Sequence, residues 1–125
     1  DEFSETVGFR IQGPKKSVLF IPDIDKWSKW KRNLRKELEK VDYAFIDATF
    51  FDAEEINHRQ FAEIPHPLVK ETAAYLSSTP KALKNKVYFI HMNHTNPLLN
   101  PKSEASKWVI QQGYHIAIKG QQFQL

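Results

Sequence analysis

Three apolar segments of the chain each lead into an acidic residue or a histidine. The segments at residues 18–22, 43–46 and 87–90 are followed by Asp23, Asp47 and His91. If these segments are neighbouring parallel strands, the three side chains meet at one edge of the sheet, where open α/β sheets bind their ligands. Two carboxylates and an imidazole, in a chain without cysteine, suit Zn, Mn or Fe(II). A bound metal would lower the pKa of its water and polarise a carbonyl or phosphoryl oxygen.

Each of the three residues also has a structural interpretation. Asp23 could cap a turn before the helix that begins near Asp25, and Asp47 could hydrogen-bond its own loop through residues 48–49. His91 could be a core histidine whose ring nitrogens are satisfied. Their equivalent positions, each at the end of a strand, favour a shared functional role.

A further histidine lies in a rigid backbone segment. His66 stands between Pro65 and Pro67, and proline fixes the local backbone. Its imidazole is a candidate general acid or metal ligand, and equally a candidate helix cap.

The polar loop at residues 92–100 carries a group of short polar side chains. Asn93, His94 and Asn96 are its candidate contacts to a substrate. The same residue types are also what a tight turn requires, so both interpretations stay open.

Strands and helices alternate along the sequence, which predicts an α/β fold with largely parallel pairing. Residues 6–12 and 17–22 form a predicted hairpin around the turn at 13–16. An apolar stripe from Trp27 to Val41 predicts one helix capped by Asp25. The further elements are a helix that starts at Pro67 with His66 as its cap, a helix after Asn100 that ends at Gly113, a strand at 115–119 and an edge strand at 121–125.

Composition narrows the class of protein. The chain has 125 residues, which predicts a single domain over residues 1–125, and it has no apolar run of the roughly 18 residues that a membrane span needs. The net charge is +3, with much of the excess at residues 26–40. We interpret that stripe as a solvated helix face rather than a nucleic-acid site, because no nucleic-acid-binding motif accompanies it. No targeting signal is visible, which favours the cytoplasm, and the missing initial Met suggests a processed chain or a fragment.

Three stretches of the chain resemble the metallo-β-lactamase superfamily. They are VLFIPDIDKW at 18–27, VDYAFIDATFF at 41–51 and IHMNHTNP at 90–97. Within the superfamily they are most similar to the branch of the pyrroloquinoline-quinone biosynthesis protein B. The resemblance implies an αββα sandwich with a metal site at the sheet edge. It also implies roles for four residues: Asp23 as the bridging metal ligand, His91 as the last histidine ligand, His66 as a substrate-side histidine, and Asp47 as a residue behind the ligands or a structural one.

The superfamily motif His-x-His-x-Asp-His is missing from the sequence. The chain therefore resembles the C-terminal half of the fold, with a mixed sheet and helices packed on one face. We expect the other face to be covered by the missing N-terminal half or by a second copy, because soluble monomers rarely expose a large apolar surface. We also expect an incomplete metal site and no activity of this chain alone.

The resulting functional hypothesis is the C-terminal part of a metal-dependent hydrolase. Metal-bound water, on Zn by preference and on Mn or Fe otherwise, would attack an ester, amide or phosphodiester of a small-molecule or peptide-derived substrate. One alternative is an oxidative enzyme or accessory protein of quinone-cofactor biosynthesis. The other is a non-catalytic interaction module with an incomplete metal site.

Overall fold

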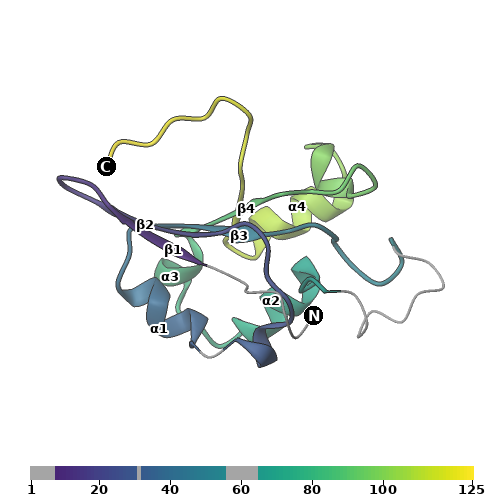
Figure 1. Cartoon of the computed structure of the whole chain (residues 1–125). Coiled ribbons are helices and arrows are strands. Elements are labelled where there is room, and N and C mark those ends of the chain that lie inside the picture. Colours follow the sequence, from purple (N-terminus) through teal and green to yellow (C-terminus); the bar gives the residue numbers. More distant parts are fainter. Residues whose placement is uncertain (1–7, 31, 56–64) are drawn as a thin grey trace.

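The computed structural model describes residues 8–30, 32–55 and 65–125. Five strands form one sheet, and short helices connect them (Figure 1). In chain order the elements are β1 Phe9–Gln12, β2 Ser17–Ile21, the 3-10 turn η1 Trp27–Lys29, α1 Leu34–Glu39, β3 Tyr43–Asp47, α2 Val69–Tyr75, α3 Lys81–Lys84, β4 Val87–Ile90, the 3-10 turn η3 Pro97–Leu99, α4 Glu104–Gln111 and β5 His115–Ile116.

The strands lie side by side in sequence order. β1 is antiparallel to β2, and each later strand is parallel to the one before it. Parallel crossovers are right-handed, so a sheet that grows in one direction carries its connecting helices on one face. Figure 1 shows α1, α2 and α3 together beneath the sheet. The mixed sheet with helices on one face confirms the predicted fold class.

Alternation along the strands builds the core on the helical face. The inward residues of β2, β3 and β4 join helix residues in one buried cluster. Its fully buried members include Ile21, Ala44, Ile46, Val87 and Phe89 from the strands, and Leu34, Leu38, Val69 and Val109 from the helices. This cluster fixes the strands whose ends carry the polar residues.

The helices of the described residues are too short or too polar to span a membrane.

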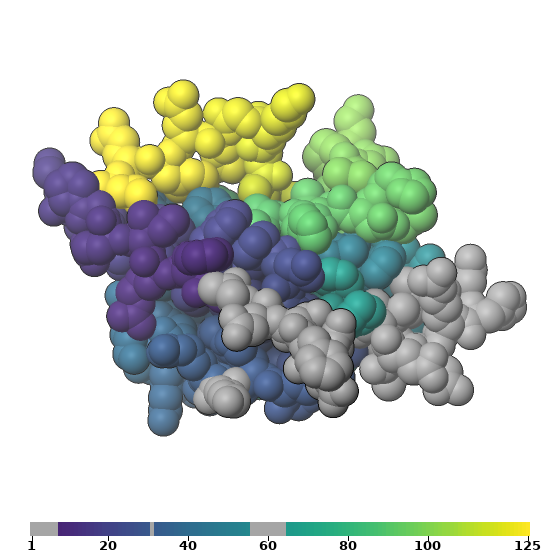
Figure 2. All heavy atoms as spheres, in the orientation of Figure 1, coloured from purple at the N-terminus to yellow at the C-terminus, as the bar shows by residue number. Residues whose placement is uncertain are grey.

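The opposite face is partly covered by the C-terminal segment. The Phe123 ring lies 5.0 Å from the rings of Tyr43, Phe45 and Tyr88. The Leu125 carbonyl accepts hydrogen bonds from the backbone N–H groups of residues 15 and 16, at 2.6 Å each. Figure 2 shows this segment, in yellow, resting against the purple N-terminal hairpin. Residues 121–125 are therefore not the predicted edge strand, because their ring contacts hold them across the sheet face.

The predicted helix from Asp25 is divided in two. η1 ends at Trp30, whose backbone is extended, and α1 begins after Asn33, whose side chain accepts from the Lys36 N–H at 3.1 Å. Trp27 is buried and donates its indole N–H to the Thr72 hydroxyl at 2.8 Å. The hydrogen bond that anchors the indole to α2 and the side-chain cap at Asn33 favour a break at residues 30–33 over the single helix that the continuous apolar stripe predicts.

Two other predicted helix starts are displaced. α2 has Leu68 rather than His66 as its N-cap, and the side chain of Glu71 in the first turn accepts from the Leu68 N–H at 2.8 Å, which fixes the helix start there. α4 has Ser103 as its N-cap and ends, as predicted, before Gly113, which has a φ of 99°. The predicted strand at 115–119 is reduced to His115–Ile116, and the short helix α3 was not predicted.

Candidate metal centre

The carboxyl ends of β2, β3 and β4 bring the predicted site residues to one edge of the sheet. Asp47 ends β3 and pairs in register with Ile90, so Asp23 and His91 follow the two flanking strands at the same edge. His66 reaches this edge from the segment before α2. Donor atoms of Asp23, Asp47 and His66 all lie within 4.8 Å of one another. Asp23 and Asp47 of the group predicted from the parallel strands therefore lie close together, but the histidine nearest to them is His66 rather than His91.

Asp47 is a buried hydrogen-bond acceptor at the centre of the group. Its side chain is fully buried, and Oδ2 accepts from the Ile24 N–H at 3.0 Å and from His66 Nδ1 at 2.7 Å. Oδ1 accepts from the Thr49 N–H at 2.8 Å and from the Thr49 hydroxyl at 2.7 Å. A carboxylate offers about four acceptor positions, so these contacts use them all. Asp47 consequently holds the loop after Asp23 and the ring of His66 rather than offering an oxygen to a cation.

His66 is oriented by this carboxylate. The hydrogen bond that His66 donates to Asp47 raises the pKa of His66 more than burial lowers it, and the charge of Asp23, with Oδ1 3.4 Å from Nδ1, adds to the rise. The backbone of His66 is fixed separately, because its carbonyl accepts from Lys26 Nζ at 2.9 Å. Lys26 Nζ also binds Glu71 Oε1 at 2.6 Å, and that carboxylate accepts from the first turn of α2 at the Leu68 N–H.

Asp23 is the most exposed member of the group. Its side chain is 71% exposed, against 17% for His66 and none for Asp47. Since Asp47 is committed to hydrogen bonds, Asp23 is the carboxylate of this group that is open to a cation. Two carboxylates, one exposed and one buried, therefore lie at this edge of the sheet, each within 3.4 Å of His66 Nδ1.

His91 lies beside the group and has an unusual backbone. Its φ of 65° is left-handed, a conformation that residues other than glycine rarely adopt and that often marks functional positions. Nδ1 lies 3.1 Å from the Thr49 hydroxyl, and the ring centroid is 6.2 Å from that of His66. Its donor atoms fall outside the close group of Asp23, Asp47 and His66.

The loop after His91 is fastened to the loop after Asp47. Asn96 is buried, and its Nδ2 donates to the Ala48 carbonyl at 2.6 Å and to the Thr49 carbonyl at 3.2 Å. The Asn93 side chain donates to Thr95 Oγ1 at 2.8 Å, while His94 is exposed at the turn. Asn96 thus ties the backbone together; a contact of Asn93, His94 or Asn96 with a substrate stays a prediction.

The structure confirms the interpretation that Asp47 hydrogen-bonds its own loop, through Thr49. The sequence did not indicate that Thr49 also contacts His66 and His91, or that Lys26 fixes the His66 carbonyl. The Asp-x-Thr spacing at 47–49 is a signal for Thr49, because an aspartate often hydrogen-bonds the backbone two residues onward. Nothing local in the sequence indicates the contact of Lys26, whose partner is 40 residues away.

The donor set fits part of a divalent metal site. Carboxylate oxygen and imidazole nitrogen suit Zn²⁺. Asp23, His66 and His91 each keep a donor atom that the described hydrogen bonds do not use, on the carboxylate of Asp23 and at Nε2 of the two histidines. The resemblance gives Asp23 and His91 to the metal and His66 to the substrate; on that assignment two ligands are fewer than the three or four that protein zinc sites use, and the site is incomplete.

Comparison with known proteins identifies the fold and the family of the chain. No curated protein matches the chain. Among solved structures, the chain is similar to Zn²⁺-bound PqqB from Methylobacterium extorquens, with a TM-score of 0.75 at 21% sequence identity. The match covers 96% of this chain and 44% of that one, so the chain spans less than half the length of that protein. Residues 1–92 match the family model described as the beta-lactamase superfamily domain, and the chain therefore belongs to the beta-lactamase superfamily.

Proposed function

We propose that this chain supplies one half of a metal-dependent hydrolase centre. The observation that carries the proposal is the convergence of an exposed carboxylate, Asp23, with the hydrogen-bonded pair of His66 and Asp47 at the carboxyl edge of the sheet. Asp23 and His91 would hold the metal, with Zn preferred. The Zn²⁺ bound to PqqB from Methylobacterium extorquens supports this choice of ion.

A bound divalent metal would supply a Lewis acid and a water of lowered pKa. The residues of this chain would supply orientation and a proton. His66 is turned by Asp47 so that Nδ1 faces the carboxylate, which leaves Nε2 for a substrate. Because its pKa is raised, more of the imidazole is protonated near neutral pH, as a general acid for the leaving group of an ester, amide or phosphodiester requires.

The experiment that tests this proposal is zinc titration by calorimetry on the wild-type chain and three variants. We expect weak binding by the wild type and its loss in Asp23→Ala and His91→Ala. His94→Ala is the matched control, because His94 is an exposed histidine in the same loop. Equal binding by all four proteins would refute the assignment of Asp23 and His91. A complex of this chain with the other half of the proposed domain should bind zinc more tightly and hydrolyse a model ester or phosphodiester, and His66→Gln should slow that reaction without releasing the metal.

A second candidate function is favoured by the fold likeness to PqqB. In that case the same residues would serve an oxidative enzyme or an accessory protein of quinone-cofactor biosynthesis. Turnover of a peptide-derived substrate only in the presence of oxygen, with no hydrolysis of model esters, would favour this alternative.

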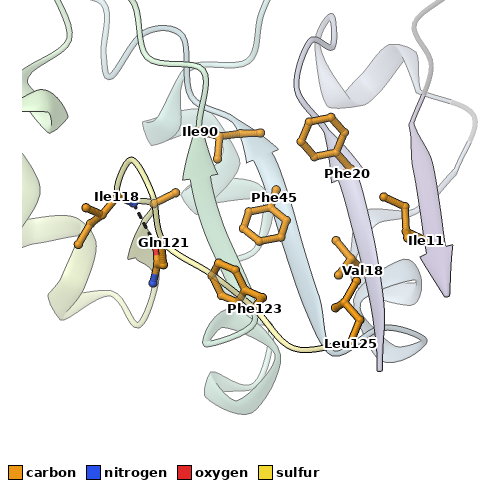
Figure 3. A pocket seen from close by; sticks show the side chains of 10 residues that line it. Ile11, Val18, Phe20, Phe45, Ile90, Ile118, Gln121, Phe123 and Leu125 are labelled. Atoms are coloured by element: carbon orange, nitrogen blue, oxygen red, sulfur yellow. Dashed lines mark hydrogen bonds between the residues drawn. The ribbon is translucent and has the colours of Figure 1, made fainter. Parts of the chain in front are cut away.

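We further propose that the open sheet face packs against the other half of an αββα domain. The face holds an apolar hollow of about 360 Å³. Phe20, Phe45 and Ile90 from three strands line it together with Phe123 and Leu125 of the C-terminal segment (Figure 3). The share of the PqqB chain that this match leaves uncovered is large enough to supply such a partner. Co-expression with that half should give a stable complex. A chain that forms no complex with the other half and remains monomeric in light scattering would contradict the proposal.

A further inference from the structure

We propose that Thr49 is a positioning residue that sets the tautomer of His91 and thereby presents its Nε2 nitrogen to the metal. The effect on metal binding rests on the proposed function, but the tautomer of His91 can be observed without any metal. The inference is based on one contact: the Thr49 hydroxyl lies between the buried carboxylate of Asp47 and the imidazole of His91.

The positions of the hydrogens follow from counting donors. Thr49 Oγ1 lies 2.7 Å from Asp47 Oδ1 and has a single hydrogen. An ionised carboxylate only accepts, so the hydroxyl hydrogen must point to Asp47. Toward His91 Nδ1, at 3.1 Å, the same oxygen can then only accept. His91 must therefore carry its hydrogen on Nδ1, which leaves the lone pair on Nε2.

The same count applies to His66. Its Nδ1 faces Asp47 Oδ2 at 2.7 Å and Thr49 Oγ1 at 3.3 Å, and both oxygens are acceptors in this arrangement. His66 consequently also carries a hydrogen on Nδ1. Free histidine in water prefers the other tautomer, with the hydrogen on Nε2. One aspartate and one threonine thus shift both rings to the less common form.

Burial and backbone geometry make the arrangement firm. Thr49 is 9% exposed, and its own N–H donates to Asp47 at 2.8 Å, so its hydroxyl has little freedom to turn toward water. The left-handed backbone of His91 is the second constraint on this ring. Histidines that bind metals commonly donate their other ring N–H to a fixed acceptor, and loss of that acceptor typically costs about 10- to 100-fold in metal affinity. We expect a loss of that size when Thr49 loses its hydroxyl.

The direct test is ¹⁵N NMR of the imidazole nitrogens in the metal-free chain, in mildly alkaline buffer where a free imidazole is neutral. The wild type should show His91 with its hydrogen on Nδ1. Thr49→Val keeps the branched shape but removes the hydroxyl, so His91 should move toward the Nε2–H form. Thr49→Ser restores the hydroxyl and should restore the wild-type spectrum, while His94 serves as an exposed internal reference.

Two results would overturn the inference: a wild-type His91 with its hydrogen on Nε2, or identical His91 spectra in the wild type and Thr49→Val. The wild-type spectrum decides the first point even if the valine variant fails to fold. Zinc titration then separates this inference from the proposed function. If Thr49 controls the tautomer but the wild type binds no zinc, the proposed function fails alone. If Asp23→Ala abolishes zinc binding while Thr49→Val changes neither tautomer nor affinity, this inference fails alone.

Discussion

Two buried carboxylates, Asp47 at the sheet edge and Glu37 on α1, are stabilised in different ways. Glu37 faces cations: Arg10 at 2.7 Å, Arg32 at 3.3 Å and Lys40 at 3.8 Å. Asp47 faces two backbone N–H groups, one hydroxyl and one imidazole. The cations neutralise the carboxylate of Glu37, and its ion pair with Arg10 links α1 to β1. Of the described donors around Asp47, His66 is the one side chain that can carry a positive charge, so the net charge at the sheet edge depends on the protonation of that imidazole, whereas three permanent cations surround Glu37.

The largest effect on folding should come from Asp47→Ala. The substitution leaves the N–H groups of Ile24 and Thr49 without their acceptor in a buried place, at about 1–3 kcal/mol each. We expect the free energy of unfolding to fall by about 3 kcal/mol or more, measured by urea denaturation with tryptophan fluorescence. Asp47→Asn, which keeps one acceptor oxygen, should fall between this variant and the wild type. A loss below that of Glu37→Gln would contradict the central position given to Asp47.

Glu37→Gln should have a smaller effect that depends on pH. Burial alone would raise the pKa of Glu37, but hydrogen bonds from Arg10 and Arg32 outweigh it and the pKa is lowered. A lowered pKa stabilises the folded chain above the unfolded-state pKa, and that contribution is lost as the pH falls through the folded-state value. We therefore expect a loss of about 1 kcal/mol at neutral pH, because the cations are half exposed. The difference from the wild type should shrink in acid, and urea midpoints at several pH values measure it.

The smallest effect on folding should come from Asp23→Asn. Its carboxylate is largely exposed, so the free energy of unfolding should change by less than about 0.5 kcal/mol. The same variant should lose at least about 10-fold in zinc affinity, since it removes a charged ligand. A stability loss as large as that of Asp47→Ala would make Asp23 a structural residue, like its neighbour.

The three central strands and their parallel pairing were predictable from the sequence, whereas the C-terminal edge strand and several helix boundaries were not. Residues 17–21, 43–47 and 87–90 were readable as strands because each run is short, apolar and bounded by polar residues. The break between η1 and α1 depends on the bond from Trp27 to Thr72, which is 45 residues away. Contacts of that range leave no local signal, and the position of the 121–125 segment on the sheet face has the same origin.

The site was predictable as a set of positions but not as a set of bonds. Parallel pairing alone places Asp23, Asp47 and His91 at one edge. Asp47 accepts four hydrogen bonds only when the loop after Asp23 and the segment at His66 are in place. The pattern of apolar residues in the strands gives no information about the position of these two segments. The left-handed backbone of His91 likewise needs the three-dimensional structure, because histidine has no strong preference for it.

The fully hydrogen-bonded Asp47 also bears on how the chain reaches its native state. Its donors come from residues 24, 49 and 66, and they meet only when β2 and β3 are paired in the native register. A slip of one residue would turn the carboxylate to the other side of the sheet, away from these donors and onto the apolar face. Misaligned sheets are therefore penalised well beyond the loss of apolar contacts. The carboxylate that organises the edge of the sheet thus also selects against wrong assemblies during folding.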